Sequence, residues 1–263
     1  MPKKQTVSTL QAMKSQKSIT MITAYDALFA KLFEEHCDVL LVGDSLNMSF
    51  SGHSDTLSTT LEQMIYHTQA VCNGAKNSFV ICDMPFGSYS NKKNALKNSI
   101  KVYSETNADA VKIEGGIEKA GVVRYLTQNG IAVVGHVGLM PQFVRSEGGY
   151  KIKGKDNISK EKVIADAKAI EAAGAFMIVL EGVKQDVAKE VTEALNVPTI
   201  GIGAGADVDG QVLVWSDMLG LFEEFTPKFV KKYLNGASLV REAVQNFDNE
   251  VKEKEFPQQK HMY

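Results

Sequence analysis

The sequence predicts an α/β protein that folds as a (β/α)₈ TIM barrel. Short apolar runs alternate with helix-like segments, eight such runs can be counted, and the length of 263 residues suits one barrel of about 250 residues. Two small domains would also fit this length. A doubly wound open sheet is the main alternative, but the G-x-G-x-x-G turn usual after an early strand of that fold is missing.

The apolar runs are rich in Val, Ile and Leu, which is typical of buried parallel strands. They cover residues 19–25, 39–44, 79–84, 110–114, 132–138, 176–181, 198–203 and 211–215. Residues 215–221 could form either strand or helix. No repeat, low-complexity tract or linker marks a second domain. We therefore expect one barrel domain over 1–263, with a short helix before the first strand and a helical segment at the C-terminus.

Helix signals occupy the segments between the runs. Thr59 and Glu62 fit a capping box before a helix that ends at Gly74. Further helices are expected at 117–129, 161–173, 186–196 and 226–256. Ser8 and Gln11 fit another capping box, so a short helix is expected before the first strand, where it could plug the bottom of the barrel.

Composition and charge exclude several classes of function. With 29 basic and 31 acidic residues, the net charge of −2 provides no basic excess for nucleic acid or a lipid surface. The three cysteines (Cys37, Cys72 and Cys82) form no C-x-x-C pair, which favours a reducing compartment. Because neither a signal peptide nor a run of about 18 apolar residues is present, we expect a soluble cytoplasmic protein.

Polar residues gather where the predicted strands end. Over five consecutive strands these residues are Asp44, Asp83, Glu114, His136 and Glu181. In a barrel these ends meet at the face that carries the active site. A single acid there could simply cap a helix, and His136 alone could be a hydrogen-bonded core residue. Four converging carboxylates repel one another and need a positive partner.

Two positive partners are possible for these carboxylates. Lys112 stands two residues before Glu114 and therefore on the same face of its strand. A hard divalent cation such as Mg²⁺ is the other candidate, because no Cys/His spacing resembles a zinc site. The loops 46–57 and 140–157 could act as lids over the site. The glycines of 201–205 resemble a phosphate-binding loop, although glycines at a strand end also simply permit close packing.

Six short motifs then occur in order along the chain. They are TAYD at 23–26, VGDSL at 42–46, VKIEGG at 111–116, GHVGL at 135–139, GGYK at 148–151 and GIGAG at 201–205. In these motifs the chain resembles the ketopantoate (3-methyl-2-oxobutanoate) hydroxymethyltransferase family, from about residue 6 to residue 257. The resemblance implies a barrel of the phosphoenolpyruvate mutase/isocitrate lyase group and a homodecameric assembly.

The resemblance also implies a reaction of pantothenate and coenzyme A biosynthesis. A one-carbon unit passes from 5,10-methylenetetrahydrofolate to 3-methyl-2-oxobutanoate and gives 2-dehydropantoate through a metal-stabilised enolate.

Roles are carried over position by position. Asp44 and Asp83 would hold Mg²⁺ and contact the oxo acid, with Glu114 as a further metal ligand, directly or through water. Ser45, Lys112 and His136 would bind the oxo acid. Glu181 would be the base, and we expect burial and neighbouring acids to raise its pKa.

Two other functions stay open on the residues alone. One is a barrel enzyme of the same group that makes or breaks a C–C bond in a related oxo acid, which folate dependence would exclude. The other is a catalytically silent barrel that binds a metabolite or acts as a scaffold, which metal binding without proton abstraction would support.

Overall fold

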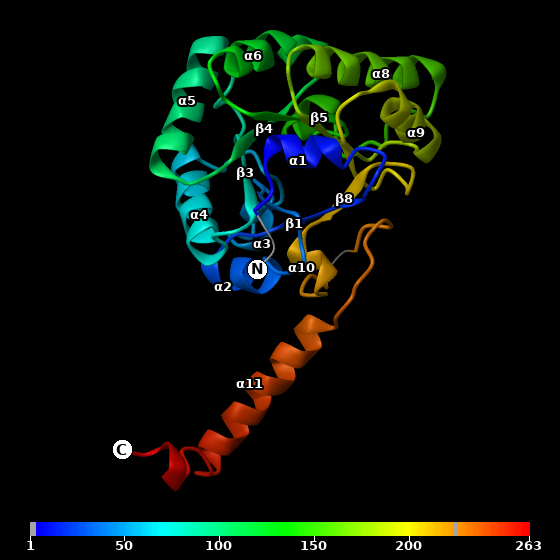
Figure 1. The fold of residues 1–263 in the computed structure, drawn as a ribbon. Helices are drawn as coiled ribbons and strands as arrows, with labels where there is room; N and C mark the ends of the chain where they lie inside the picture. Colours follow the sequence, from blue (N-terminus) through cyan, green and yellow to red (C-terminus); the bar gives the residue numbers. More distant parts are fainter. Residues whose placement is uncertain (1–3, 224–225) are drawn as a thin grey trace. The chain divides into compact units, whose positions relative to one another are not determined.

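The computed structural model describes residues 4–223 and 226–263, and eight parallel strands form a closed barrel in chain order (Figure 1). The strands are β1 Ile19–Thr23, β2 Val39–Val42, β3 Phe79–Asp83, β4 Ala110–Glu114, β5 Val133–Gly138, β6 Met177–Glu181, β7 Thr199–Ile202 and β8 Gly210–Leu213. Each of the eight predicted runs overlaps one strand, so the predicted barrel is confirmed. The residues after Val214 begin a helix, which resolves the ambiguity at 215–221.

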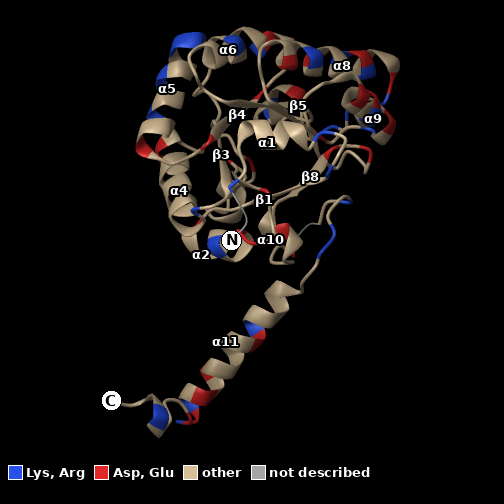
Figure 2. Ribbon diagram, viewed as in Figure 1, with Lys and Arg blue, Asp and Glu red and all other residues tan. Residues whose placement is uncertain are grey.

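Helices pack around the barrel, α1 across its bottom and most of the others on its outer side (Figure 1). They are α1 Val7–Ala12, α2 Ala27–Phe33, α3 Leu46–Ser49, α4 Leu61–Gly74, α5 Lys92–Glu105, α6 Ile117–Gln128, α7 Val144–Glu147, α8 Asn157–Ala172 and α9 Gln185–Ala194, with the short 3₁₀ helix η1 Pro141–Phe143 before α7. Between β7 and β8 the chain forms only the loop 203–209, all of which the structure describes. No helix separates these two strands, so the strand–helix alternation is interrupted here. Acidic and basic residues both occur along α5, α6, α8 and α9 (Figure 2).

Both predicted capping boxes are wrong in register. The box of α4 is formed by Thr60 and Gln63, because the buried Thr59 side chain instead donates to the carbonyl oxygen of Asp44, at 3.4 Å. The box of α1 is formed by Thr6 and Thr9, which places Ser8 inside the first turn.

The N-terminal helix closes the bottom of the barrel, as its predicted position suggested. Leu10 and Met13 are buried in the same apolar cluster as the inward side chains of the strands. Lys14 Nζ lies 2.9 Å from Asp209 Oδ2, which also accepts a hydrogen bond from the Thr199 backbone N–H. A partly buried, hydrogen-bonded ion pair thus joins this end of α1 to the segments that lead into β7 and β8.

Residues Trp215–Tyr263 form a second compact unit, which contains α10 Trp215–Met218, α11 Gly236–Lys252 and the short 3₁₀ helix η2 Gln259–His261. The helix predicted at 226–256 is therefore wrong for residues 226–235. The backbone N–H groups of Tyr233 and Gly236 donate to the carbonyls of Met218 and Leu219, and these bonds hold an irregular segment in place of a helical turn. That both units belong to one domain stays a prediction. None of the helices described is long and apolar enough to cross a membrane.

Candidate active site

Strand alternation places most of the predicted site residues inside the barrel. Inward positions recur every second residue, so Phe79 and Ile81 in β3 are followed on the same face by Asp83. The same parity applies to β4, where Lys112 and Glu114 follow Ala110, and to His136 in β5 and Glu181 in β6. The inner apolar layers therefore end in a polar layer at the carboxyl ends of the strands.

Lys112 occupies the middle of this polar layer. It pairs in register with Asp83 across the β3–β4 ladder, and its Nζ lies 2.6 Å from Asp83 Oδ1 with both side chains buried. Burial lowers the pKa of Lys112, but the carboxylates of Asp83, Glu114 and Asp44 outweigh it and raise the pKa above the usual value. Lys112 is therefore charged near neutral pH, and it is one of the two positive partners that the sequence predicted for these carboxylates.

Asp44 and Ser45 reach the site by a backbone turn. The strand ends at Val42, and alternation alone would direct Asp44 toward the helix layer. A Cβ atom at Gly43 would lie 2.8 Å from Ser45 Oγ, so glycine permits this close turn. The Asp44 backbone N–H then donates to Asp83 Oδ2 at 3.3 Å, and Ser45 Oγ hydrogen-bonds the Tyr25 hydroxyl at 2.7 Å.

His136 is a neutral, buried link between the carboxylates. Its Nε2 lies 2.9 Å from the Leu139 carbonyl oxygen, an acceptor, so this nitrogen carries the proton. Its Nδ1 lies 3.3 Å from Lys112 Nζ and accepts from it. Burial and the Lys112 charge lower the pKa of His136 well below the usual value, so its 3.5 Å contacts with Glu114 and Glu181 are not ion pairs.

Glu181 differs from the other acids of the site in its exposure. Its side chain is 21% exposed, whereas those of Asp83 and Glu114 are 3% and 1% exposed. The pKa of Glu181 is raised to about 8: burial has the largest effect, Lys112 lowers the pKa, and Asp44 and Asp83 raise it. The expected rise in pKa is therefore confirmed in direction, with burial as its main cause. A carboxylate of this kind can reach a ligand and accept a proton near neutral pH.

The sequence analysis missed two residues of the site, Gln142 and Tyr89. Gln142 lies in η1, at the start of the segment predicted as a lid, and contacts Asp44, Glu114 and Tyr89. Neither residue follows a strand directly, so the strand-end pattern could not identify them. The two predicted lid segments also touch, because Arg145 Nη2 lies 3.2 Å from Asp55 Oδ2.

For a metal ion, the site offers two carboxylates rather than three. In the described ranges 4–223 and 226–263, no three His, Cys, Asp or Glu side chains form a group that could hold one ion. Asp44 and Asp83 do lie together, and burial raises the pKa of both, that of Asp44 to about 7. Asp83 Oδ1, although close to Lys112, receives no well-aligned hydrogen bond from a described residue. Mg²⁺ often takes only one or two protein carboxylates, so this pair fits it.

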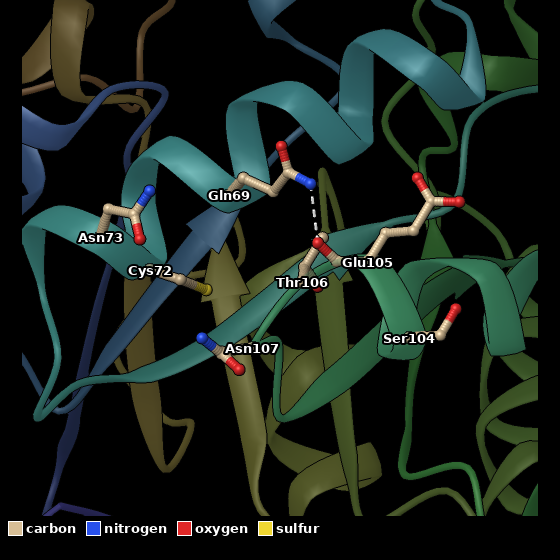
Figure 3. A pocket seen from close by; sticks show the side chains of 7 residues that line it. All are labelled: Gln69, Cys72, Asn73, Ser104, Glu105, Thr106 and Asn107. Carbon is tan, nitrogen blue, oxygen red and sulfur yellow. Dashed lines mark hydrogen bonds between the residues drawn. The ribbon is translucent and has the colours of Figure 1, made fainter.

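A separate cavity of about 310 Å³ lies where α4 and α5 end (Figure 3). The side chain of Gln69 extends across part of this cavity, and its Nε2 donates to the Glu105 carbonyl oxygen at 2.7 Å (Figure 3). Burial raises the pKa of the Cys72 thiol in its wall to about 11, so this sulfur is a poor nucleophile. The cavity is lined by helix ends and none of the predicted site residues.

Comparison with solved structures concerns the fold. The chain is similar to 2,3-dimethylmalate lyase, a member of the phosphoenolpyruvate mutase/isocitrate lyase superfamily, with a TM-score of 0.62, 17% identity and coverage of 98% of this chain and 91% of that one. It is also similar to phosphonopyruvate hydrolase in complex with oxalate and Mg²⁺, with a TM-score of 0.62, 15% identity and coverage of 95% and 88%. The fold of this chain is therefore a (β/α)₈ barrel like those of these two enzymes.

Sequence comparison then defines the family. The model of the ketopantoate hydroxymethyltransferase family matches residues 4–259. The 3-methyl-2-oxobutanoate hydroxymethyltransferase of Aliarcobacter butzleri is 65% identical over 99% of this chain and 97% of that protein. The enzyme of the same name from Helicobacter pylori is 56% identical over 99% and 97%. The chain belongs to the ketopantoate hydroxymethyltransferase family and is an enzyme.

Proposed function

We propose that this enzyme transfers a hydroxymethyl group from 5,10-methylenetetrahydrofolate to 3-methyl-2-oxobutanoate, giving 2-dehydropantoate for pantothenate biosynthesis. Family membership supports the overall reaction. One observation in the site supports its chemistry: Glu181, partly exposed and with a pKa raised to about 8, stands beside a layer of buried carboxylates around one lysine. This arrangement suits removal of a weakly acidic proton next to a carbonyl group.

Each residue has a distinct task in this proposal. Lys112 supplies the charge that holds the carboxylate of the oxo acid, and Ser45 contacts the same substrate. Asp44 and Asp83 would hold Mg²⁺ or a similar ion, which supplies positive charge to the carbonyl oxygen as an enolate forms. Glu114 would be a further ligand of the ion, directly or through water, and its Oε2 accepts a hydrogen bond from the Gln142 backbone N–H at 3.0 Å.

The proton transfer is carried by Glu181. Its carboxylate takes the proton from C3 of 3-methyl-2-oxobutanoate, and C3 then bonds to the methylene carbon of the folate. The two bonds from this carbon to folate nitrogens break, a water molecule supplies the hydroxyl oxygen, and tetrahydrofolate leaves. His136 remains neutral and contacts the oxo acid, and its Nε2 lies 3.5 Å from Glu181 Oε2. The loops 46–57 and 140–157 shield the site from bulk water during proton transfer.

The direct test is deuterium exchange at C3 of 3-methyl-2-oxobutanoate in D₂O, followed by proton NMR with and without Mg²⁺. The folate donor is added afterwards. We expect exchange that depends on Mg²⁺, then 2-dehydropantoate once folate is present. Exchange without product on folate addition would instead favour another enzyme of the superfamily. If the folded, Mg²⁺-loaded protein shows no exchange and also forms no product, the proposal is contradicted.

The same proposal includes a cytoplasmic homodecamer. An apolar stripe on α11 supports assembly, since Val240, Val244, Phe247 and Val251 recur at helical spacing and are each 46–61% exposed. Sedimentation of the full chain measures the size of the assembly, and a stable monomer at micromolar concentration would contradict it.

Replacing Lys112 with methionine is expected to raise the KM for 3-methyl-2-oxobutanoate by at least about tenfold. A hydrogen bond between charged groups contributes roughly 1.5–3 kcal/mol, and methionine keeps the length of the side chain without its charge. Steady-state kinetics measures the effect. Lys14→Met is the matched control, because it removes a partly buried lysine from an ion pair at the other end of the barrel. An unchanged KM for Lys112→Met would contradict the proposed contact between Lys112 and the substrate carboxylate.

The rate of C3 exchange is expected to fall at acid pH with a midpoint well above the ordinary pKa of 4.5 for a glutamate. The base acts only when ionised, and burial raises the pKa of Glu181 to about 8. Below that pH most Glu181 is protonated, so the rate should drop by about tenfold per pH unit. NMR exchange rates between pH 5 and 9 measure the profile. A rate independent of pH between 5 and 7 would contradict Glu181 as the base.

A further inference from the structure

Gln142 is a buried amide whose donors and acceptor are all engaged. Its Nε2 donates to Asp44 Oδ2 at 2.8 Å and to the Met84 carbonyl oxygen at 2.9 Å. Its Oε1 accepts a hydrogen bond from the hydroxyl of Tyr89, which is also buried. Its backbone N–H donates to Glu114 Oε2 at 3.0 Å. One residue of the β5–α8 connection thus binds groups at the ends of β2, β3 and β4.

The orientation of this amide is determined by its neighbours. Asp44 Oδ2 and the Met84 carbonyl oxygen are acceptors, so the NH₂ group must face both of them. The amide oxygen then faces Tyr89, and the phenol has to be the donor in that contact. Burial and the nearby carboxylates of Glu114, Asp83 and Asp44 raise the pKa of Tyr89 well above the usual value, so the hydroxyl keeps its proton.

We propose that Gln142 is a positioning residue that holds the Asp44 carboxylate in the rotation required to bind the divalent cation, and that Tyr89 sets the orientation of Gln142. This inference rests on the proposed function, because it assumes an ion at Asp44 and Asp83. A hydrogen bond to one carboxylate oxygen prevents the group from turning about its Cβ–Cγ bond. Its loss would leave a buried carboxylate that is free to rotate away from the ion or toward Lys112.

The test is the affinity for Mn²⁺, a paramagnetic substitute for Mg²⁺, measured on the full chain without substrate by the electron paramagnetic resonance of free Mn²⁺. Gln142→Met keeps the approximate volume and removes the amide. We expect its Kd for Mn²⁺ to rise about 10–100-fold, the usual effect of losing a residue that orients a metal ligand. Tyr89→Phe should raise the Kd by a smaller factor, because the amide loses only the contact that orients it.

Gln69→Met is the matched control. It is the same substitution at a glutamine whose Nε2 also donates to a carbonyl oxygen, but in the cavity between α4 and α5 (Figure 3). Its Kd for Mn²⁺ should equal that of the unmodified protein. A purely structural role for Gln142 would lower the melting temperature and leave the Kd unchanged, so both quantities are measured for every variant.

The outcomes separate the two proposals. Tight Mn²⁺ binding by the unmodified protein with an unchanged Kd in Gln142→Met would overturn the positioning role alone. If Gln142→Met does not fold, an unchanged Kd in folded Tyr89→Phe overturns the positioning role, and an increased Kd supports it. Absence of Mn²⁺ binding in the unmodified protein would overturn the metal site of the proposed function and this inference with it.

Discussion

Replacing Glu181 with glutamine is expected to slow removal of the C3 proton by roughly 10²–10⁴-fold, while 3-methyl-2-oxobutanoate still binds. Glutamine has nearly the same shape as glutamate and no basic oxygen at working pH. Lys112 and the aspartate pair, which bind the substrate and the ion in our proposal, are left in place. C3 exchange in D₂O measures the rate, and a titration of the oxo acid followed by calorimetry measures its binding.

This prediction is specific because Glu181 contacts the rest of the site weakly. Its contact with His136 is 3.5 Å long, and its side chain is the most exposed of the four acids, so the amide creates little strain. Glu171→Gln, the same change on the outer helix α8, should leave the exchange rate unaltered. Loss of oxo-acid binding together with the exchange rate would argue that Glu181 holds the substrate and is not the base.

Replacing Asp83 with asparagine is expected to have two effects of different origin. Affinity for the divalent cation should fall by at least about tenfold, because one of two carboxylate ligands becomes a neutral amide. The free energy of unfolding should fall by about 3 kcal/mol, since Lys112 stays buried after losing the partner at 2.6 Å. Mn²⁺ titration measures the first effect and urea denaturation the second.

Asp209→Asn separates these effects. Asp209 is also a buried carboxylate in an ion pair, with the partly buried Lys14, at the opposite end of the barrel from the strand-end site. Its replacement should lower the stability and leave the affinity for Mn²⁺ unchanged. If Asp83→Asn likewise lowers the stability and leaves the affinity for Mn²⁺ unchanged, Asp83 is a structural partner of Lys112 and not a metal ligand.

The sequence alone was sufficient to predict the barrel strands and most residues of the polar layer above the core. Strand alternation is a local property of the backbone, so the residues that share a face with Ile81 or Ala110 can be read from their spacing. Asp83, Lys112 and Glu114 follow from this rule. The helix limits were less predictable, since the cap of α4 depends on Thr59 turning toward Asp44, a residue 15 positions away.

By itself the sequence determined the eight buried strands, the parity of the inward side chains and the need for a positive charge among four acids. Only the tertiary structure decided how those charges are arranged. It placed Asp44 inside through the turn at Gly43, against the parity of its strand, and left Glu114 bound to the Gln142 backbone. It also brought Gln142 onto Asp44 across 98 positions. Such contacts depend on where the barrel closes and where loops cross it, and no local spacing encodes them.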